Sequence, residues 1–154
     1  MYIFSDVAVA ELKRAGWFPA RSVDTGKYVA FFEAEGFVWH EKALDFLREF
    51  GDLKLNYPLP SGIIQEISMD ISDPNALSVA NVENDSRILG IPLCPIAEVD
   101  EGFTRLEMSP TGDVYIRFQG TLEYAGASGE EVLDSLLSGN FWQTERPDLL
   151  PVEN

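Results

Sequence analysis

The sequence offers few of the side chains that carry nucleophilic or metal chemistry, because it holds one histidine, His40, and one cysteine, Cys94. Cys94 lies in the apolar run 91–96, where a buried and inert thiol is expected. His40 stands near the start of a predicted helix, which favours a role in capping that helix or a place on the surface. One histidine and one cysteine do not readily make a zinc site or a nucleophile–base pair.

Carboxylates are the abundant reactive groups, with 26 Asp and Glu in 154 residues. Asp70 and Asp73 lie near a predicted strand end, but their spacing is not that of a calcium loop with its distal Glu. The segment around Lys27 lacks the upstream glycine of a phosphate-binding loop, and no dinucleotide-binding glycine pattern occurs. We therefore predict a binding protein without cofactor, metal or catalytic residues. An enzyme that uses Asp70 and Asp73 stays open as an alternative.

The net charge of −15 is unevenly distributed along the chain. Residues 1–60 carry 9 acids and 7 bases, a net charge of −2, whereas residues 61–154 carry 17 acids and 4 bases, a net charge of −13. Such a surface repels nucleic acid and attracts a basic protein partner, although acidity also serves solubility alone. No apolar run is long enough to span a membrane and no secretory leader is recognisable, so we expect a cytoplasmic protein.

Helical apolar spacing predicts three N-terminal helices, over residues 5–15, 25–35 and 40–50. Val7, Ala8, Leu12 and Ala15 form the expected inner face of the first. Each helix is followed by a glycine, which we expect to take the left-handed backbone conformation that ends helices. Their aromatic side chains predict a shared core with Trp17 as an anchor.

After residue 51 the apolar spacing changes to period two, which is typical of strands. We predict strands over residues 53–57, 63–71 and 89–93, and a hairpin of residues 103–108 and 114–118. A short helix is expected within 75–84, and a capping box of Ser128 and Glu131 starts a last helix through Leu137. Residues 1–142 should form one α+β domain, followed by a polar, loosely ordered tail over residues 143–154.

Six short motifs, in this order, resemble the third subfamily of the SUKH immunity-protein superfamily. They lie at residues 16–21, 46–53, 73–74, 89–98 and 112–115 and in the closing helix to Gly139. The motif residues to which we assign structural roles are Gly16, Trp17, Arg21, Phe50, Gly51, Asp73, Pro74, Gly90 and Gly112. Three positions depart from the family pattern, because Ala20, Asp52 and Ala97 stand where glycines are usual.

The resemblance implies an α+β fold with a central mixed, mostly antiparallel sheet. It also implies neutralisation of a toxin delivered between competing bacteria, often a nuclease, by binding in the cytoplasm. From charge we expect the acidic sheet half to face this basic partner, and the predicted contact residues are Glu83, Asp85, Glu98, Asp100, Glu101 and Glu107. The alternative is a cytosolic adaptor that binds a host protein. Whether the partner meets side chains or an exposed strand edge stays open.

Overall fold

In the computed structural model, the described residues (2–71, 78–99, 104–118, 120–141 and 150–151) form five helices and seven strands. The chain order is α1 (Asp6–Arg14), α2 (Gly26–Glu35), α3 (Glu41–Phe50), β1 (Lys54–Pro58), β2 (Ile64–Ser68), α4 (Val79–Leu89), β3 (Cys94–Val99), β4 (Thr104–Met108), β5 (Val114–Phe118), β6 (Thr121–Gly126), α5 (Gly129–Ser138) and β7 (Leu150–Pro151). Helices precede the sheet and one helix follows most of it. The predicted α+β class is confirmed.

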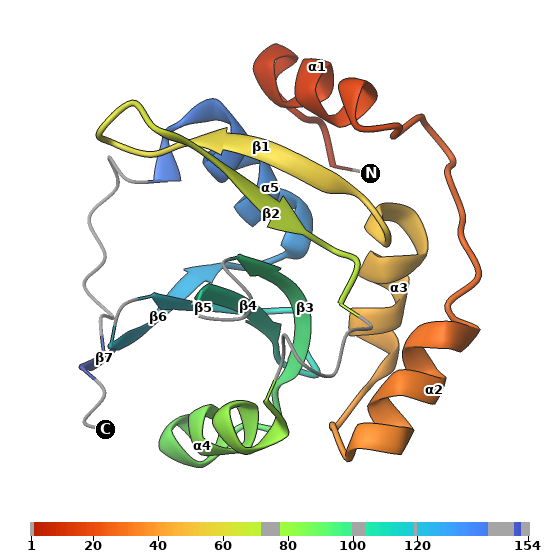
Figure 1. The fold of residues 1–154 in the computed structure, drawn as a ribbon, viewed down its shortest axis with the longest axis vertical. Coiled ribbons are helices and arrows are strands. Elements are labelled where there is room, and N and C mark those ends of the chain that lie inside the picture. Colours follow the sequence, from red (N-terminus) through yellow and green to blue (C-terminus); the bar gives the residue numbers. More distant parts are fainter. Residues whose placement is uncertain (1, 72–77, 100–103, 119, 142–149, 152–154) are drawn as a thin grey trace.

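The strands lie side by side in chain order, β1 to β7, and every described pair is antiparallel. The parallel component of the implied mixed sheet is therefore not found among the described strands. β3, β4, β5 and β6 form ladders of four or five residue pairs, with register shifts between Pro95 and Ala97 and between Val114 and Tyr115, whereas the described part of the β2–β3 ladder is the single pair Ser68 and Glu98. As Figure 1 shows, the β1–β2 hairpin consequently diverges from the remaining strands.

The N-terminal helices and α5 enclose one aromatic-rich core against the sheet (Figure 1). α3 lies against β3, α5 lies against β1 and β6, and α1 packs on α5. The predicted inward residues of α2 and α3 are all buried: Tyr28, Phe31, Phe32, Ala43, Phe46, Leu47 and Phe50. The inward position predicted for Val7 is wrong, since this residue is 61% exposed and α1 buries only the narrow stripe of Ala8 and Leu12.

The glycines after the helices fall into two classes. Gly16 and Gly36 have φ of +109° and +86°, as predicted for left-handed positions. Gly51 has φ −54°, so the prediction for this residue is wrong. A Cβ atom there would lie 2.3 Å from the Leu47 carbonyl oxygen and 2.9 Å from the Tyr28 hydroxyl. Gly51 is needed for this close approach, and the left-handed turn is made by Asp52, with φ +69°.

The region between β2 and β3 differs most from the prediction. The expected short helix is α4, which begins after the cap Ser78 and continues to Leu89. The predicted strand over 89–93 is wrong, because Gly90 ends α4 in the left-handed conformation and the strand starts only at Cys94. A short run of Ile and Leu fits a helix end as well as a strand, which explains the error.

The C-terminal elements agree with the prediction where they are described. The hairpin is present as β4 and β5, and Ser128 caps α5 by accepting a hydrogen bond from the Glu131 N–H at 3.1 Å. β6 is an additional strand that the apolar spacing does not indicate. Of the expected tail, only Leu150 and Pro151 belong to the described residues, and they pair with Leu122 and Thr121 of β6.

Candidate functional site

The structure brings only part of the predicted acidic patch to the surface. Glu83 is exposed on α4 and Glu98 is partly exposed on β3, whereas Asp100 and Glu101 lie outside the described residues. Asp85 and Glu107 are both 0% exposed. The expectation that these two acids are exposed is wrong, because the fold places them in a charge network beneath α4.

Two arginines, Arg105 of β4 and Arg117 of β5, form the basis of this network. They stand directly opposite each other in the antiparallel ladder, an arrangement that is unfavourable for like charges. Asp85 of α4 lies between them: the Arg105 Nη2–H donates to its Oδ2 at 2.8 Å, and the Arg117 Nη2–H donates to its Oδ1. One buried carboxylate therefore bridges two strands and attaches α4 to both.

Glu107 completes the network, on the same face of β4 as Arg105. Its Oε1 lies 3.6 Å from the Arg105 Nε, and its carboxyl group contacts that of Asp85. Burial, followed by the hydrogen bond and the charge of Asp85, raises the pKa of Glu107 well above its ordinary value. Burial also acts to raise the pKa of Asp85, but hydrogen bonds from Glu107, Arg117 and Arg105 outweigh it and lower that pKa. A proton held between these two carboxyl groups would therefore reside on Glu107.

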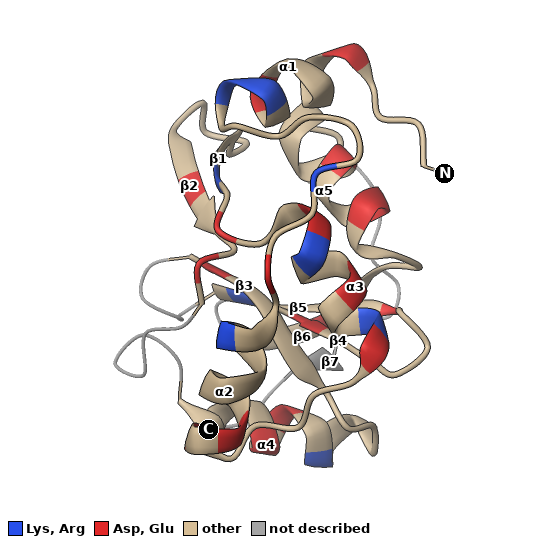
Figure 2. Ribbon diagram, turned by 90° about the vertical axis from the view of Figure 1, so that its right-hand side faces the viewer, with Lys and Arg blue, Asp and Glu red and all other residues tan. Residues whose placement is uncertain are grey.

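Burial of two arginines in this network makes the exposed surface of residues 61–154 more acidic than the sequence alone indicates. Residues 61–154 contain four bases, and two of them, Arg105 and Arg117, are buried. Arg87 on α4 is then the one exposed base of residues 61–154 within the described part of the chain. Exposed acids of the same half are Glu66, Asp70, Glu83 and Glu131. Figure 2 shows further Asp and Glu positions on α1, α3 and α5. Sequence reasoning missed the two arginines, although the alternation of Arg105, Leu106 and Glu107 already assigns both charges to one face of a strand.

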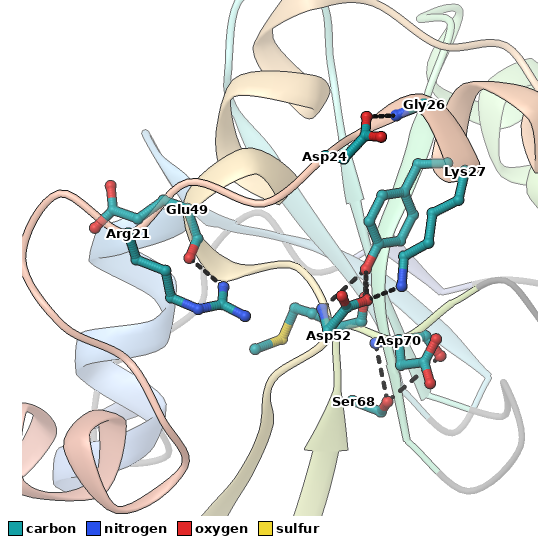
Figure 3. A network of polar contacts seen from close by, with 10 residues as sticks. Arg21, Asp24, Gly26, Lys27, Glu49, Asp52, Ser68 and Asp70 are labelled. Atoms are coloured by element: carbon teal, nitrogen blue, oxygen red, sulfur yellow. Dashed lines mark hydrogen bonds and ion pairs between the residues drawn. The ribbon is translucent and has the colours of Figure 1, made fainter.

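A second polar network lies where α2, α3 and the start of the sheet meet (Figure 3). The left-handed residue Asp52 binds Lys27 through its carboxylate. Its N–H donates to the Tyr28 hydroxyl at 2.8 Å, and that hydroxyl lies 2.6 Å from Asp52 Oδ1 and 2.8 Å from the Met69 carbonyl oxygen. Burial opposes ionisation of Asp52, but the hydrogen bonds from Lys27 and Tyr28 lower its pKa. This network fixes the turn after α3.

The segment between α1 and α2 is attached to the end of α3 through Glu49. The Trp17 Nε1–H donates to Glu49 Oε2 at 2.9 Å, and the Arg21 Nη1–H donates to the Glu49 carbonyl oxygen at 2.5 Å, a contact drawn in Figure 3. Trp17 is only partly buried, so it packs at the margin of the core and not within it. Ala20 has φ +67°.

The remaining described motif residues have structural positions, in the core or at left-handed turns. Phe50 is fully buried, and Gly90 and Gly112 have φ of +68° and +95°. Asp73 and Pro74 lie outside the described residues. Two of the three departures from the family pattern, Ala20 and Asp52, are the described non-glycine residues with positive φ. Glycine is favoured at such positions because it takes this conformation without strain.

The two residues best suited to chemistry have structural positions. The predicted capping role of His40 is confirmed, because its Nδ1 accepts a hydrogen bond from the Ala43 N–H at 3.2 Å. Its Nε2 lies 2.9 Å from the Met108 carbonyl oxygen, which requires the Nε2–H tautomer. Cys94 is buried, and its desolvation raises the thiol pKa. Within the described ranges, no group of three or more His, Cys, Asp and Glu could hold a metal ion.

The outer edge of β1 is occupied by α1. Glu11 Oε2 accepts a hydrogen bond from the Asn56 N–H at 2.7 Å, and the Arg14 Nη2–H lies 3.3 Å from the Lys54 carbonyl oxygen. Glu11 and Arg14 also pair with each other. These side chains take the backbone groups that an added strand would use, which disfavours strand addition at β1.

Comparison with known proteins agrees with these observations. A family model described as SUKH-3 immunity protein matches residues 4–139, from just before α1 to the residue after α5. No curated protein and no solved structure gives a significant match to the chain. No helix among the described residues is long and apolar enough to cross a membrane. Because the match covers most of its 154 residues, the chain belongs to the SUKH-3 immunity protein family.

Proposed function

We propose that this protein binds and neutralises one cognate protein toxin, a nuclease whose nucleic-acid-binding surface is basic. Membership of the SUKH-3 family supports the immunity role, and the net charge of −15 supports a basic partner. The proposed inhibition is steric: the bound acidic protein covers the surface on which the toxin holds nucleic acid. Binding takes place in the cytoplasm, where the toxin would act, and needs no catalytic residue or cofactor.

The observation that carries this proposal is the burial of two basic residues in the second half of the chain. Burial of Arg105 and Arg117 leaves acids, with Arg87, as the charged surface of the described residues after 60. A surface of one sign accelerates encounter with an oppositely charged partner, and salt weakens this effect. At the β1 edge, Glu11 and Arg14 disfavour strand addition, and we place recognition on side chains.

We place the contact surface on α4 and the end of β3. Glu83 is exposed on α4, and Glu98 stands opposite Arg105, the residue that binds Asp85 of α4. Asp100 and Glu101 follow Glu98 closely in the sequence and complete the proposed set. Asp85 and Glu107 do not belong to it, because they are buried.

The first test is capture of partners from the native cytosol with this protein as bait, at low and at high salt. We expect one basic polypeptide with nuclease activity, whose association slows as salt rises, and we expect the bait to abolish that activity at equal molarity. Recovery of a housekeeping protein, insensitive to salt and without nuclease activity, would refute the immunity role and favour an adaptor.

The second test locates the surface. We expect Glu83→Lys combined with Glu98→Lys to slow association with the captured toxin about tenfold at low salt, because the pair adds repulsion where attraction is proposed. The matched control is Glu33→Lys combined with Glu35→Lys, an equal change of charge at exposed positions of α2. Equal slowing by both pairs would show that only the net charge matters, and the proposed surface would be wrong.

A further inference from the structure

α4 is attached to the rest of the molecule mainly by charge. Of its 11 residues, only Val82 and Asp85 are buried, whereas the similar-sized α3 buries five residues, all apolar. Burial of apolar side chains supplies most of the free energy that holds a helix on a sheet, so α4 has little of it. What α4 has in its place is the bridge from Asp85 to Arg105 and Arg117.

The geometry around the bridge favours a bound proton on Glu107. Glu107 is completely buried, and neither of its carboxyl oxygens has a hydrogen-bond partner, since the nearby Arg105 Nε is 3.6 Å from Oε1. The group that its carboxyl contacts is the Asp85 carboxylate, which accepts hydrogen bonds but donates none. Two adjacent carboxyl groups in a buried site repel each other when both are ionised, which favours one proton held between them; Arg105 and Arg117 offset part of this repulsion without reaching hydrogen-bond distance of Glu107. The titratable and charged groups that face Glu107 from the elements around it are Asp85 on α4, Arg105 on β4, Arg117 and Tyr115 on β5, and Cys94 on β3.

We propose that α4 is a detachable element, fastened to the sheet by the Asp85 bridge, and that the proton on Glu107 keeps it fastened. Loss of this proton places a second negative charge against Asp85 in a site closed to water, and detachment of α4 hydrates both carboxylates. Gain of a proton by Asp85 removes the bridge and leaves Arg105 and Arg117 facing each other. Because α4 carries Glu83, this device would regulate the surface described under the proposed function, on which that consequence rests.

The two carboxyl groups give opposite dependences on pH. The pKa of Glu107 is raised in the docked state, so its contribution is complete below the ordinary value of 4.5 and is lost as pH rises toward the raised value. The pKa of Asp85 is lowered, so its contribution is complete above 3.8 and is lost as pH falls through the lowered value. Docking of α4 should therefore be strongest at about pH 4, and above about pH 5 detachment should become about tenfold more favourable per pH unit, until the raised pKa of Glu107 is reached.

The test is hydrogen exchange of backbone amides, expressed as protection factors that correct for the intrinsic pH dependence of exchange. In the wild type we expect the protection of α4 to fall about tenfold per pH unit above about pH 5, while α3 keeps its protection in the same samples. Glu107→Gln supplies a permanent N–H donor toward Asp85, and it should make the α4 protection independent of pH in this range. The matched control is Glu83→Gln, the same chemical change at an exposed position of α4, which should behave as the wild type does.

The proposal is overturned if α4 and α3 lose protection together in the wild type, or if Glu107→Gln retains the fall. Should Glu107→Gln not fold, the comparison of α4 with α3 in the wild type decides the matter alone. None of these measurements involves a toxin, so their outcome is separate from that of the proposed function. If α4 detaches but no toxin is found, only the regulatory consequence is lost.

Discussion

Gly51 and Gly36 both follow a helix, but we predict opposite responses when the same residues replace them. Gly36 has φ +86° and no atom within 4 Å of the position that a Cβ would take, so its only requirement is the left-handed conformation. Gly51 has an ordinary φ of −54°, and a Cβ there would lie 2.3 Å from the Leu47 carbonyl oxygen. Its requirement is space, because a backbone carbonyl cannot move aside as a flexible side chain can.

The magnitudes follow from these two causes. Gly36→Ala places an alanine in the left-handed region, at a cost of about 1–2 kcal/mol, and Gly36→Asn should recover most of this because asparagine tolerates that region. At position 51, a forced backbone shift costs about 1–3 kcal/mol. The shift also disturbs the Tyr28 hydroxyl, 2.9 Å from the Cβ position, which adds about 0.5–1.5 kcal/mol for a lost hydrogen bond. We expect Gly51→Ala to lose about 2–4 kcal/mol in all, and the larger Gly51→Asn to lose more.

The assay is equilibrium unfolding in urea of the four variants, with far-ultraviolet circular dichroism as the probe. The order of the Ala and Asn variants at each position is more informative than any single value. If Gly51→Asn is more stable than Gly51→Ala, as at position 36, then position 51 is selected for its backbone conformation. In that case our account of the close approach would be wrong.

Three further predictions concern the same region. Trp17→Ala should cost about 2–3 kcal/mol, less than the roughly 3–5 kcal/mol of a buried aromatic because Trp17 is partly exposed, and an unchanged melting curve would contradict its packing. Ala20→Gly should stabilise by about 0.5–1 kcal/mol because it relieves φ +67°, whereas a lower urea midpoint would show that no strain is present. Since the pKa of Asp52 is lowered, its contribution is present above 3.8 and lost as pH falls through the lowered value. Asp52→Asn should therefore flatten the acid limb of urea-unfolding stability, and an unaltered limb would count against the Lys27 and Tyr28 contacts.

Elements whose apolar spacing and end signals agree can be predicted from the sequence. The helices α1, α2, α3 and α5 are such cases, since Ser5, His40 and Ser128 cap three of them as the local pattern indicates. Where an apolar run is short, as at residues 88–93, spacing does not distinguish helix from strand, and the predicted boundary between α4 and β3 is wrong for this reason. The family resemblance rests on short local motifs, which the sequence contains directly, and the family-model match over residues 4–139 confirms it.

The sequence by itself determined the fold class, the family and the excess of acid in residues 61–154, because these depend on composition and on neighbours along the chain. Only the tertiary structure decided which of those acids are exposed. Nothing in the local sequence distinguishes Asp85 and Glu107 from Glu83 and Glu98. They are buried because the fold packs α4 on β4 and β5, where Asp85 meets Arg117, a residue 32 positions later in the chain. Burial of a charge depends on a partner that stands far away in the chain, and no local pattern specifies that partner.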